Sequence, residues 1–136
     1  MATRSILQQW GIPAAELIQM DGSGLSRYDY LTANLLAGIL VRIARSDRLR
    51  QPFEAALSIA GRDGTLSGRM KSTAAEGNAR AKTGSMSNVR ALAGYVTTAD
   101  GEPLVFAILA NNFPTPAAPV TQTIDAIVAR LAAFRR

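Results

Sequence analysis

The chain has 136 residues, of which 48% are hydrophobic and 18% are charged, and its formal net charge is +5. This length and balance are typical of one globular domain and exclude an intrinsically disordered chain. The sequence contains neither cysteine nor histidine, which excludes disulfides, thiolate chemistry and a Ser-His-Asp triad and disfavours a zinc site. We therefore expect a single domain over residues 1–136, with no metal and no cofactor, in which Lys, Asp, Glu or Tyr is the general base.

Charge and hydropathy also limit the partners. No apolar stretch approaches the roughly 18 residues of a membrane-spanning helix, and residues 1–12 show no signal peptide. The net positive charge comes mostly from arginine, and several arginines cluster near one expected helix end, where cations favour the helix dipole. Without interleaved aromatic residues or a nucleic-acid motif, a basic nucleic-acid-binding domain is the weakest of three hypotheses. We expect no nucleic-acid partner and no membrane span.

The first half of the sequence predicts helices and loops. A short helix over residues 3–10 ends near Gly11, and the following residues become extended towards Met20. A turn cluster follows, and then apolar residues at helical spacing run from Leu31, with Thr32 as N-cap and an end near Ser46. The remaining expected elements are a weaker helix over 53–58, a loop over 61–78 and one helical turn over 66–70.

The second half predicts strands and a closing helix. The expected strands are 79–85, 89–98 and 104–110, with an Asp-Gly turn between the last two. Apolar residues from Val120 to Leu131 then recur at helical spacing. The predicted fold class is α+β, an antiparallel three-stranded meander flanked by helices, in which the outer strand is open on one side.

The most informative segment is Lys82-Thr83-Gly84, which lies on the first expected strand and is followed by Ser85. Lys82 offers a compact cation for proton transfer and for a substrate carboxylate. The hydroxyl of Thr83 can bind the same carboxylate, and Gly84 lets a substrate backbone approach closely. The backbone N–H of Ser85 is a candidate oxyanion donor. Taken alone the tripeptide is a weak signal, because a surface strand can contain it by chance.

A second segment, Asp21-Gly-Ser-Gly-Leu-Ser-Arg27, precedes the first long helix. It is not a dinucleotide-binding fingerprint, because Arg27 occupies the position of the third glycine, and it lacks the Gly-Lys-Ser/Thr of a Walker loop. Ser23 and Ser26 would be nucleophiles only beside a base, and the sequence indicates none. A Gly-rich turn before a helix is the alternative interpretation.

Together with Leu92-Ala-Gly-Tyr-Val96, these two segments resemble the low-molecular-mass class C penicillin-binding proteins, which are serine-type D-alanyl-D-alanine carboxypeptidases/endopeptidases. The resemblance implies a partial β-lactamase/DD-peptidase-like (transpeptidase-like) fold and an acyl-enzyme mechanism on peptidoglycan peptides or β-lactams. It implies that Lys82, Thr83, Gly84 and Ser85 form the strand that binds the peptide and its terminal carboxylate. It also implies a periplasmic or cell-envelope location for the complete protein.

Two of the three signatures of these enzymes are missing from the sequence. The only lysines are Lys71 and Lys82, and the residues three positions before them are Gly68 and Ala79, so there is no Ser-x-x-Lys. No asparagine has a serine two positions earlier, so there is no Ser-x-Asn. We therefore expect the chain to correspond to the C-terminal part of such an enzyme and to be inactive alone.

The remaining alternative is a non-catalytic module. An open strand beside Lys82 can pair with a peptide or with a second copy of the chain. A homodimer through an open sheet edge is therefore part of this second hypothesis.

Overall fold

The computed structural model describes residues 2–136, and its first half contains mainly helices. The elements in this half are α1 (Ala2–Gln9), the 3₁₀ turn η1 (Ala14–Glu16), β1 (Leu17–Ile18), β2 (Tyr30–Leu31), α2 (Ala33–Ala44) and α3 (Arg50–Ala55). The short strands β1 and β2 pair antiparallel with each other only. The side chain of Thr32 accepts a hydrogen bond from the N–H of Leu35, which confirms the expected N-cap of α2.

The second half forms the main sheet and the last helix. Its elements are β3 (Ser58–Ile59), the 3₁₀ turn η2 (Gly64–Leu66), β4 (Arg80–Met86), β5 (Val89–Thr97), β6 (Pro103–Asn111) and α4 (Ala117–Ala132). The sheet has four strands in the order β3-β4-β5-β6, and every pair is antiparallel. The expected meander of three strands is present, and β3 adds a short fourth strand.

Two local predictions are wrong for identifiable reasons. The helix expected over 53–58 begins at Arg50, because Pro52 lies in its first turn, where the missing N–H removes no helical hydrogen bond. Ser58 pairs with Ala81 in the sheet instead of extending that helix. The helical turn expected over 66–70 lies earlier, at Gly64–Leu66.

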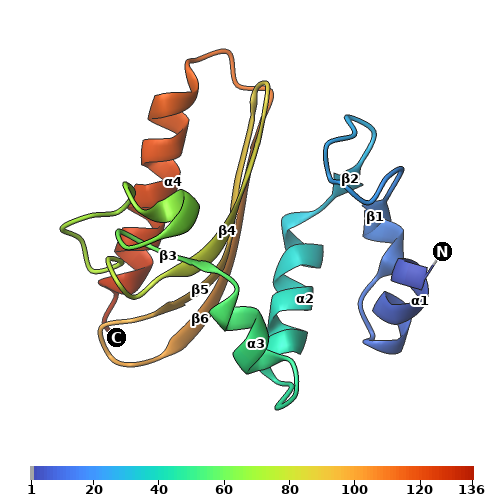
Figure 1. The fold of residues 1–136 in the computed structure, drawn as a ribbon, viewed down its shortest axis with the longest axis horizontal. Coiled ribbons are helices and arrows are strands. Elements are labelled where there is room, and N and C mark those ends of the chain that lie inside the picture. Colours follow the sequence, from blue (N-terminus) through green and yellow to red (C-terminus); the bar gives the residue numbers. More distant parts are fainter. Residues whose placement is uncertain (1) are drawn as a thin grey trace.

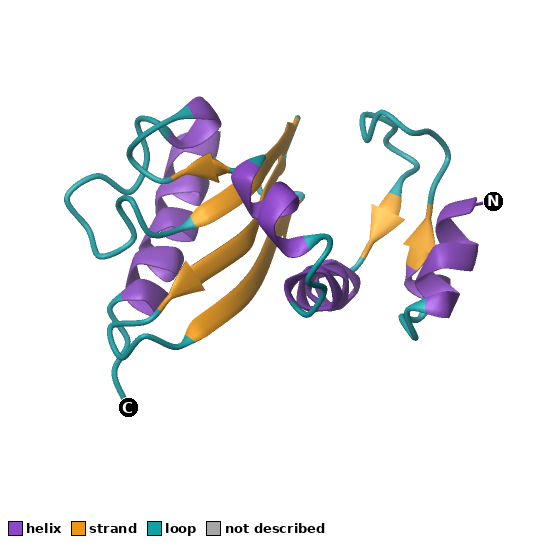
Figure 2. Ribbon diagram, turned by 60° about the horizontal axis from the view of Figure 1, so that its bottom comes forward, coloured by secondary structure: helices purple, strands orange, loops and turns teal. Residues whose placement is uncertain are grey.

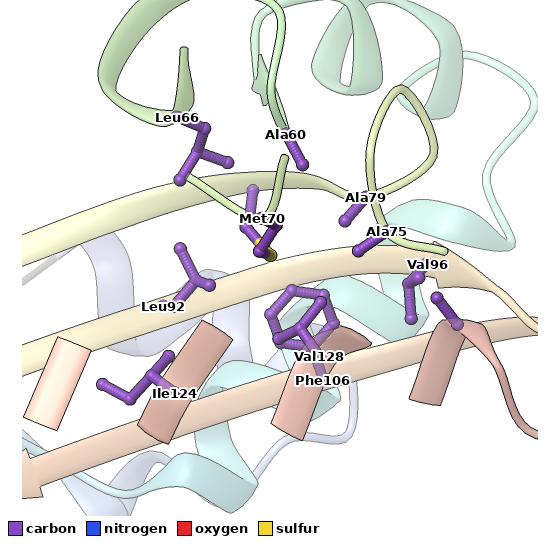
Figure 3. Close-up of a cluster of buried hydrophobic side chains, with 12 residues drawn as sticks. Ala60, Leu66, Met70, Ala75, Ala79, Leu92, Val96, Phe106, Ile124 and Val128 are labelled. Atoms are coloured by element: carbon purple, nitrogen blue, oxygen red, sulfur yellow. The ribbon is translucent and has the colours of Figure 1, made fainter. Parts of the chain in front are cut away.

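Helices cover both faces of the sheet, with α4 on one face and α2 on the other (Figures 1 and 2). The larger hydrophobic cluster lies between the sheet and α4 (Figure 3). In it, Leu92 and Phe106 from the sheet lie with Ile124 and Val128 from α4, and all are at most 5% exposed. The fold is therefore α+β, as expected, and its main core lies on the α4 side.

The helix α2 links the sheet to the N-terminal residues. On one side, Leu35 belongs to a smaller hydrophobic cluster with Leu7, Ile12 and Leu17. On the other side, the hydroxyl of Tyr95 on β5 donates a hydrogen bond of 2.9 Å to the carbonyl oxygen of Leu40. In Figure 2 this helix is seen between the sheet and the N-terminal elements.

The strands β4 and β5 approach closely at Gly94. A Cβ atom at this position would collide with the carbonyl oxygen of Arg80 and lie 2.7 Å from the Cα of Ala81. Both contacts are with backbone atoms, so a side chain at 94 would require the two strands to separate.

We predict that Gly94→Ala lowers the free energy of unfolding by more than about 2 kcal/mol, because it forces β4 away from β5. The measurement is urea denaturation followed by circular dichroism. Gly68→Ala is the matched control, because nothing lies within 4 Å of a Cβ built there, and we expect a change within about 0.5 kcal/mol. Equal stability of the two variants would contradict the close approach.

We predict that Tyr95→Phe costs about 1 kcal/mol, because it removes the hydrogen bond to Leu40. Burial, and then the Glu54 carboxylate, raise the pKa of Tyr95 from 10.0 to about 12, against a smaller opposing effect of Arg50. Since the pKa of Tyr95 is raised in the folded state, the stabilisation by its protonated hydroxyl is complete below about pH 10. It is lost as the pH rises through about 12. Chemical denaturation at pH 8 to 11.5 measures both, with the exposed Tyr28→Phe as control.

Candidate functional site

The predicted site residues lie on strand β4, and their side chains lie on both faces of the sheet. Ala81 is fully buried in the cluster under α4. Because side chains alternate along a strand, Thr83 and Ser85 lie on the same face as Ala81, towards α4. Lys82 and Gly84 lie on the opposite face, which is the face that α2 covers. The four predicted residues are therefore brought together along one strand but divided between its two faces.

Lys82 is exposed. Its ammonium group donates a hydrogen bond of 2.9 Å to the carbonyl oxygen of Thr83, and it takes part in no ion pair within residues 2–136. The cation is therefore at the surface beside the strand, where a ligand can reach it.

One edge of β4 is largely uncovered. The short strand β3 pairs only with Arg80 and Ala81, so residues 82–86 have no neighbouring strand on that side among the described residues. Strand edges of this kind present unpaired N–H and C=O groups, to which an extended peptide can add as a further strand. The Lys82-Thr83-Gly84 segment lies along this uncovered stretch.

A pocket of about 250 Å³ lies beside the same segment, on the α4 side. Its lining residues come from η2 and the loop after it, β4, β5 and α4, and they are Thr65, Arg69, Thr83, Gly84, Ser85, Arg90, Ala91, Thr121 and Ile124. The hydroxyl of Thr83 donates a hydrogen bond of 3.1 Å to that of Thr65. Lys82 does not line this pocket, because it lies on the other face of the strand.

Sequence reasoning missed several of these lining residues. Arg90 could have been found, because a hairpin with its turn between Met86 and Val89 places Arg90 opposite Ser85. Arg69 and Thr121 come from segments that are far from β4 in the sequence, and no pattern in the sequence predicts that they meet there.

The Asp21–Arg27 segment forms a self-contained turn between β1 and β2. Oδ1 of Asp21 accepts hydrogen bonds of 3.0 Å from the N–H groups of Ser23 and Gly24. These contacts, with that of Gly24 first, lower the pKa of Asp21 below its ordinary value of 3.8. The hydroxyl of Ser23 donates to Oδ2 of the same carboxylate. No hydrogen bond or ion pair among residues 2–136 joins this segment to Lys82–Ser85. The segment is therefore described by the alternative interpretation, a Gly-rich turn before a helix.

Metal-binding and membrane-spanning features are absent from the part of the chain that the structure describes. No group of three or more acidic, histidine or cysteine side chains lies close enough to hold a metal ion. None of the helices combines the length and apolar character needed to cross a bilayer.

Comparison with known proteins gives a consistent picture. Residues 1–134 match the family model of the D-Ala-D-Ala carboxypeptidase 3 (S13) family. The D-alanyl-D-alanine carboxypeptidase of Actinomadura sp. strain R39 is 44% identical over 129 residues, which are 91% of this chain and 23% of that protein. A crystal structure of penicillin binding protein 4 (dacB) from Haemophilus influenzae has a TM-score of 0.86 and 36% identity over 98% of this chain and 31% of that chain. A structure of the same protein in complex with a β-lactam has a TM-score of 0.85.

The chain thus spans about a quarter of the length of the curated relatives that it matches. The family match covers nearly all of its residues, and the crystal structures share its arrangement of helices and sheet. Both findings confirm the resemblance carried by the Lys82-Thr83-Gly84 strand and the Asp21–Arg27 turn. The chain belongs to the S13 family of D-Ala-D-Ala carboxypeptidases.

Proposed function

We propose that this chain is the C-terminal portion of a serine-type D-Ala-D-Ala carboxypeptidase/endopeptidase that acts on peptidoglycan peptides through an acyl-enzyme. It supplies the substrate-binding strand of that enzyme and not the nucleophile. The observation that carries the proposal is the uncovered edge of β4 at residues 82–86, with the exposed cation of Lys82 beside it.

Each residue of the strand has a distinct role in this proposal. The edge of β4 pairs with the substrate peptide as an added strand. Lys82 provides positive charge on the α2 side of the strand and assists proton transfer there. The nucleophile itself does not belong to this chain. On the α4 side, the hydroxyl groups of Thr83 and Ser85 contact the terminal carboxylate, and the N–H of Ser85 donates to the oxyanion of the tetrahedral intermediate.

Because Gly84 has no side chain, β4 can lie close to β5 at the place where the substrate is proposed to bind. A Cβ atom at position 84 would lie 3.2 Å from the Cβ of Ala91, which is a tight contact with the neighbouring strand. A side chain here would therefore disturb the pairing of β4 with β5 as well as the approach of a peptide.

The complete protein acts, in this proposal, in the periplasm or cell envelope, where peptidoglycan lies. The support comes from the relatives, which include D-alanyl-D-alanine carboxypeptidases. The β-lactam complex of the Haemophilus influenzae protein supports β-lactams as further ligands of the complete enzyme.

A second candidate function concerns the opposite edge of the sheet, which is formed by β6. The outer edge of β6, Pro103–Asn111, has no strand partner among the described residues. An open edge of nine residues can pair with another chain. For the non-catalytic alternative we expect pairing at the open strand beside Lys82, and this edge of β6 offers a homodimer a second open edge.

We predict that a blocked L-Lys-D-Ala-D-Ala peptide binds the 136-residue chain and shifts the amide NMR signals of residues 82–86. Lys82→Gln should weaken binding by at most two- to fivefold, because the cation beside the binding edge attracts the anionic peptide without contacting its carboxylate, an effect of up to about 1 kcal/mol. Lys71→Gln, which removes the only other lysine, should leave the affinity unchanged. Peptide-induced shifts confined to β6 would contradict the proposed binding edge.

We predict that the same chain forms no stable adduct with fluorescent penicillin, because it has no Ser-x-x-Lys motif. Denaturing gel electrophoresis and intact-mass measurement test this. A covalent mass increase that survives denaturation would show that a serine in this chain is nucleophilic and would contradict the division of labour proposed above.

A further inference from the structure

The pocket beside β4 has the composition of an anion site. Its lining residues include two arginines, Arg69 and Arg90, and four hydroxyl-bearing residues, Thr65, Thr83, Ser85 and Thr121, and no acidic residue is among them. Guanidinium and hydroxyl donors that converge on a small space favour a carboxylate or another small oxyanion. The volume of about 250 Å³ is below the usual range for drug-sized ligands, which favours a terminal amino-acid group over a bulky one.

The charge of one of the two arginines is already neutralised. Nη2 and Nε of Arg69 donate to Oδ1 of Asp125 at 2.6 and 3.1 Å, and both side chains are 19% exposed. This two-pronged ion pair fixes the loop after η2 against α4. Arg69 therefore forms a wall of the pocket but contributes little net charge to it.

Arg90 is different, because its charge has no carboxylate partner among the described residues. It takes part in none of the ion pairs found within residues 2–136. Its Nη1 donates hydrogen bonds of 2.7 Å to the carbonyl oxygens of Met86 and Val89, which hold the guanidinium over the hairpin turn. Both of these bonds use one nitrogen, so the N–H groups of Nε and Nη2 remain available to a ligand.

The sheet register places Arg90 beside the proposed carboxylate contacts. Arg90 pairs directly with Ser85, and its neighbour Leu92 pairs with Thr83. Directly paired residues project to the same face of a sheet, and Leu92 is buried in the cluster under α4. Arg90, Thr83 and Ser85 thus share the α4 face, and Lys82 lies on the other.

We propose that Arg90 is the cation that binds the terminal carboxylate of the peptide, together with the hydroxyl groups of Thr83 and Ser85. This inference rests on the proposed function, in which a peptide adds to the edge of β4, and it names a residue outside the Lys-Thr-Gly segment. The two positive charges then have separate roles. Arg90 holds the carboxylate on the α4 face, and the ammonium of Lys82 is left free for chemistry on the α2 face.

The test compares two ligands on the 136-residue chain: a blocked peptide ending in D-Ala-D-Ala and the same peptide with a C-terminal amide. Affinities come from NMR titration of the β4 amides. The wild-type chain should prefer the carboxylate by about tenfold, the effect of one charge-assisted interaction. In Arg90→Gln the preference should fall to twofold or less, at roughly unchanged affinity for the amide. Arg90→Lys should recover only part of it, because an ammonium lacks the guanidinium fork.

Arg135→Gln is the matched control, since it removes the same charge from an exposed residue outside the pocket, and it should keep the tenfold preference. Because Arg90 also holds the turn, a second readout uses the wild-type chain alone. The Nε–H signal of Arg90 should shift with the carboxylate peptide and stay in place with the amide. This readout decides the matter if Arg90→Gln does not fold.

The possible results separate the two proposals. If neither peptide binds the wild-type chain, the proposed function fails and this inference fails with it. If both bind at β4 but the preference for the carboxylate persists in Arg90→Gln, or the Nε–H signal does not respond, the proposed function stands and the assignment of Arg90 is overturned.

Discussion

The pairing of β4 with β5 determines the geometry of everything around the candidate site. Seven residue pairs, from Arg80 with Tyr95 to Met86 with Val89, fix the register. The fully buried Ala81 and Leu92 lock it, because a slip of either strand by one residue would move that strand's buried residue from the core to the opposite face. Gly94 permits the pairing by leaving room for the backbone of β4.

This register gives the two faces of β4 different chemistry. One face continues the hydrophobic core under α4 and then, beyond Ala81, opens into a pocket whose lining includes hydroxyl-bearing residues and two arginines. The other face carries Lys82 towards the side covered by α2. The uncovered part of β4 and the neighbouring β5 can thus present a substrate with a hydrogen-bonding backbone and with two separate cations, Lys82 and Arg90. An edge of this kind suits the strand addition of a peptide that we propose.

Much of this arrangement could be predicted from local sequence. The three long strands, the Asp-Gly turn at Gly101 and the Thr32 cap follow from alternation, turn chemistry and capping, and the structure confirms them. The short strand β3 could not be predicted, because a strand of two residues is created by its partner and not by its own propensity. The expected start of α3 is wrong because Pro52 is tolerated in a first turn.

The site was predicted in part. Lys82 to Ser85 were recognised from their motif, and their binding roles remain proposals. Arg90 lies four residues after Met86 and pairs with Ser85 across the β4–β5 hairpin. The register of the expected hairpin could therefore have predicted this pair, but the sequence analysis did not use it. The contact between Arg69 and Asp125 joins residues 56 positions apart, and nothing in either local sequence indicates it.

The Arg69–Asp125 contact also makes the pocket depend on the docking of α4. The hairpins of β4, β5 and β6 form between neighbours in the sequence, so their edge can appear early in folding. The pocket requires α4 to dock across a much longer loop closure. A form of the protein in which α4 is detached would therefore still offer an edge for peptide pairing, but it would no longer distinguish a free chain end from the middle of a peptide.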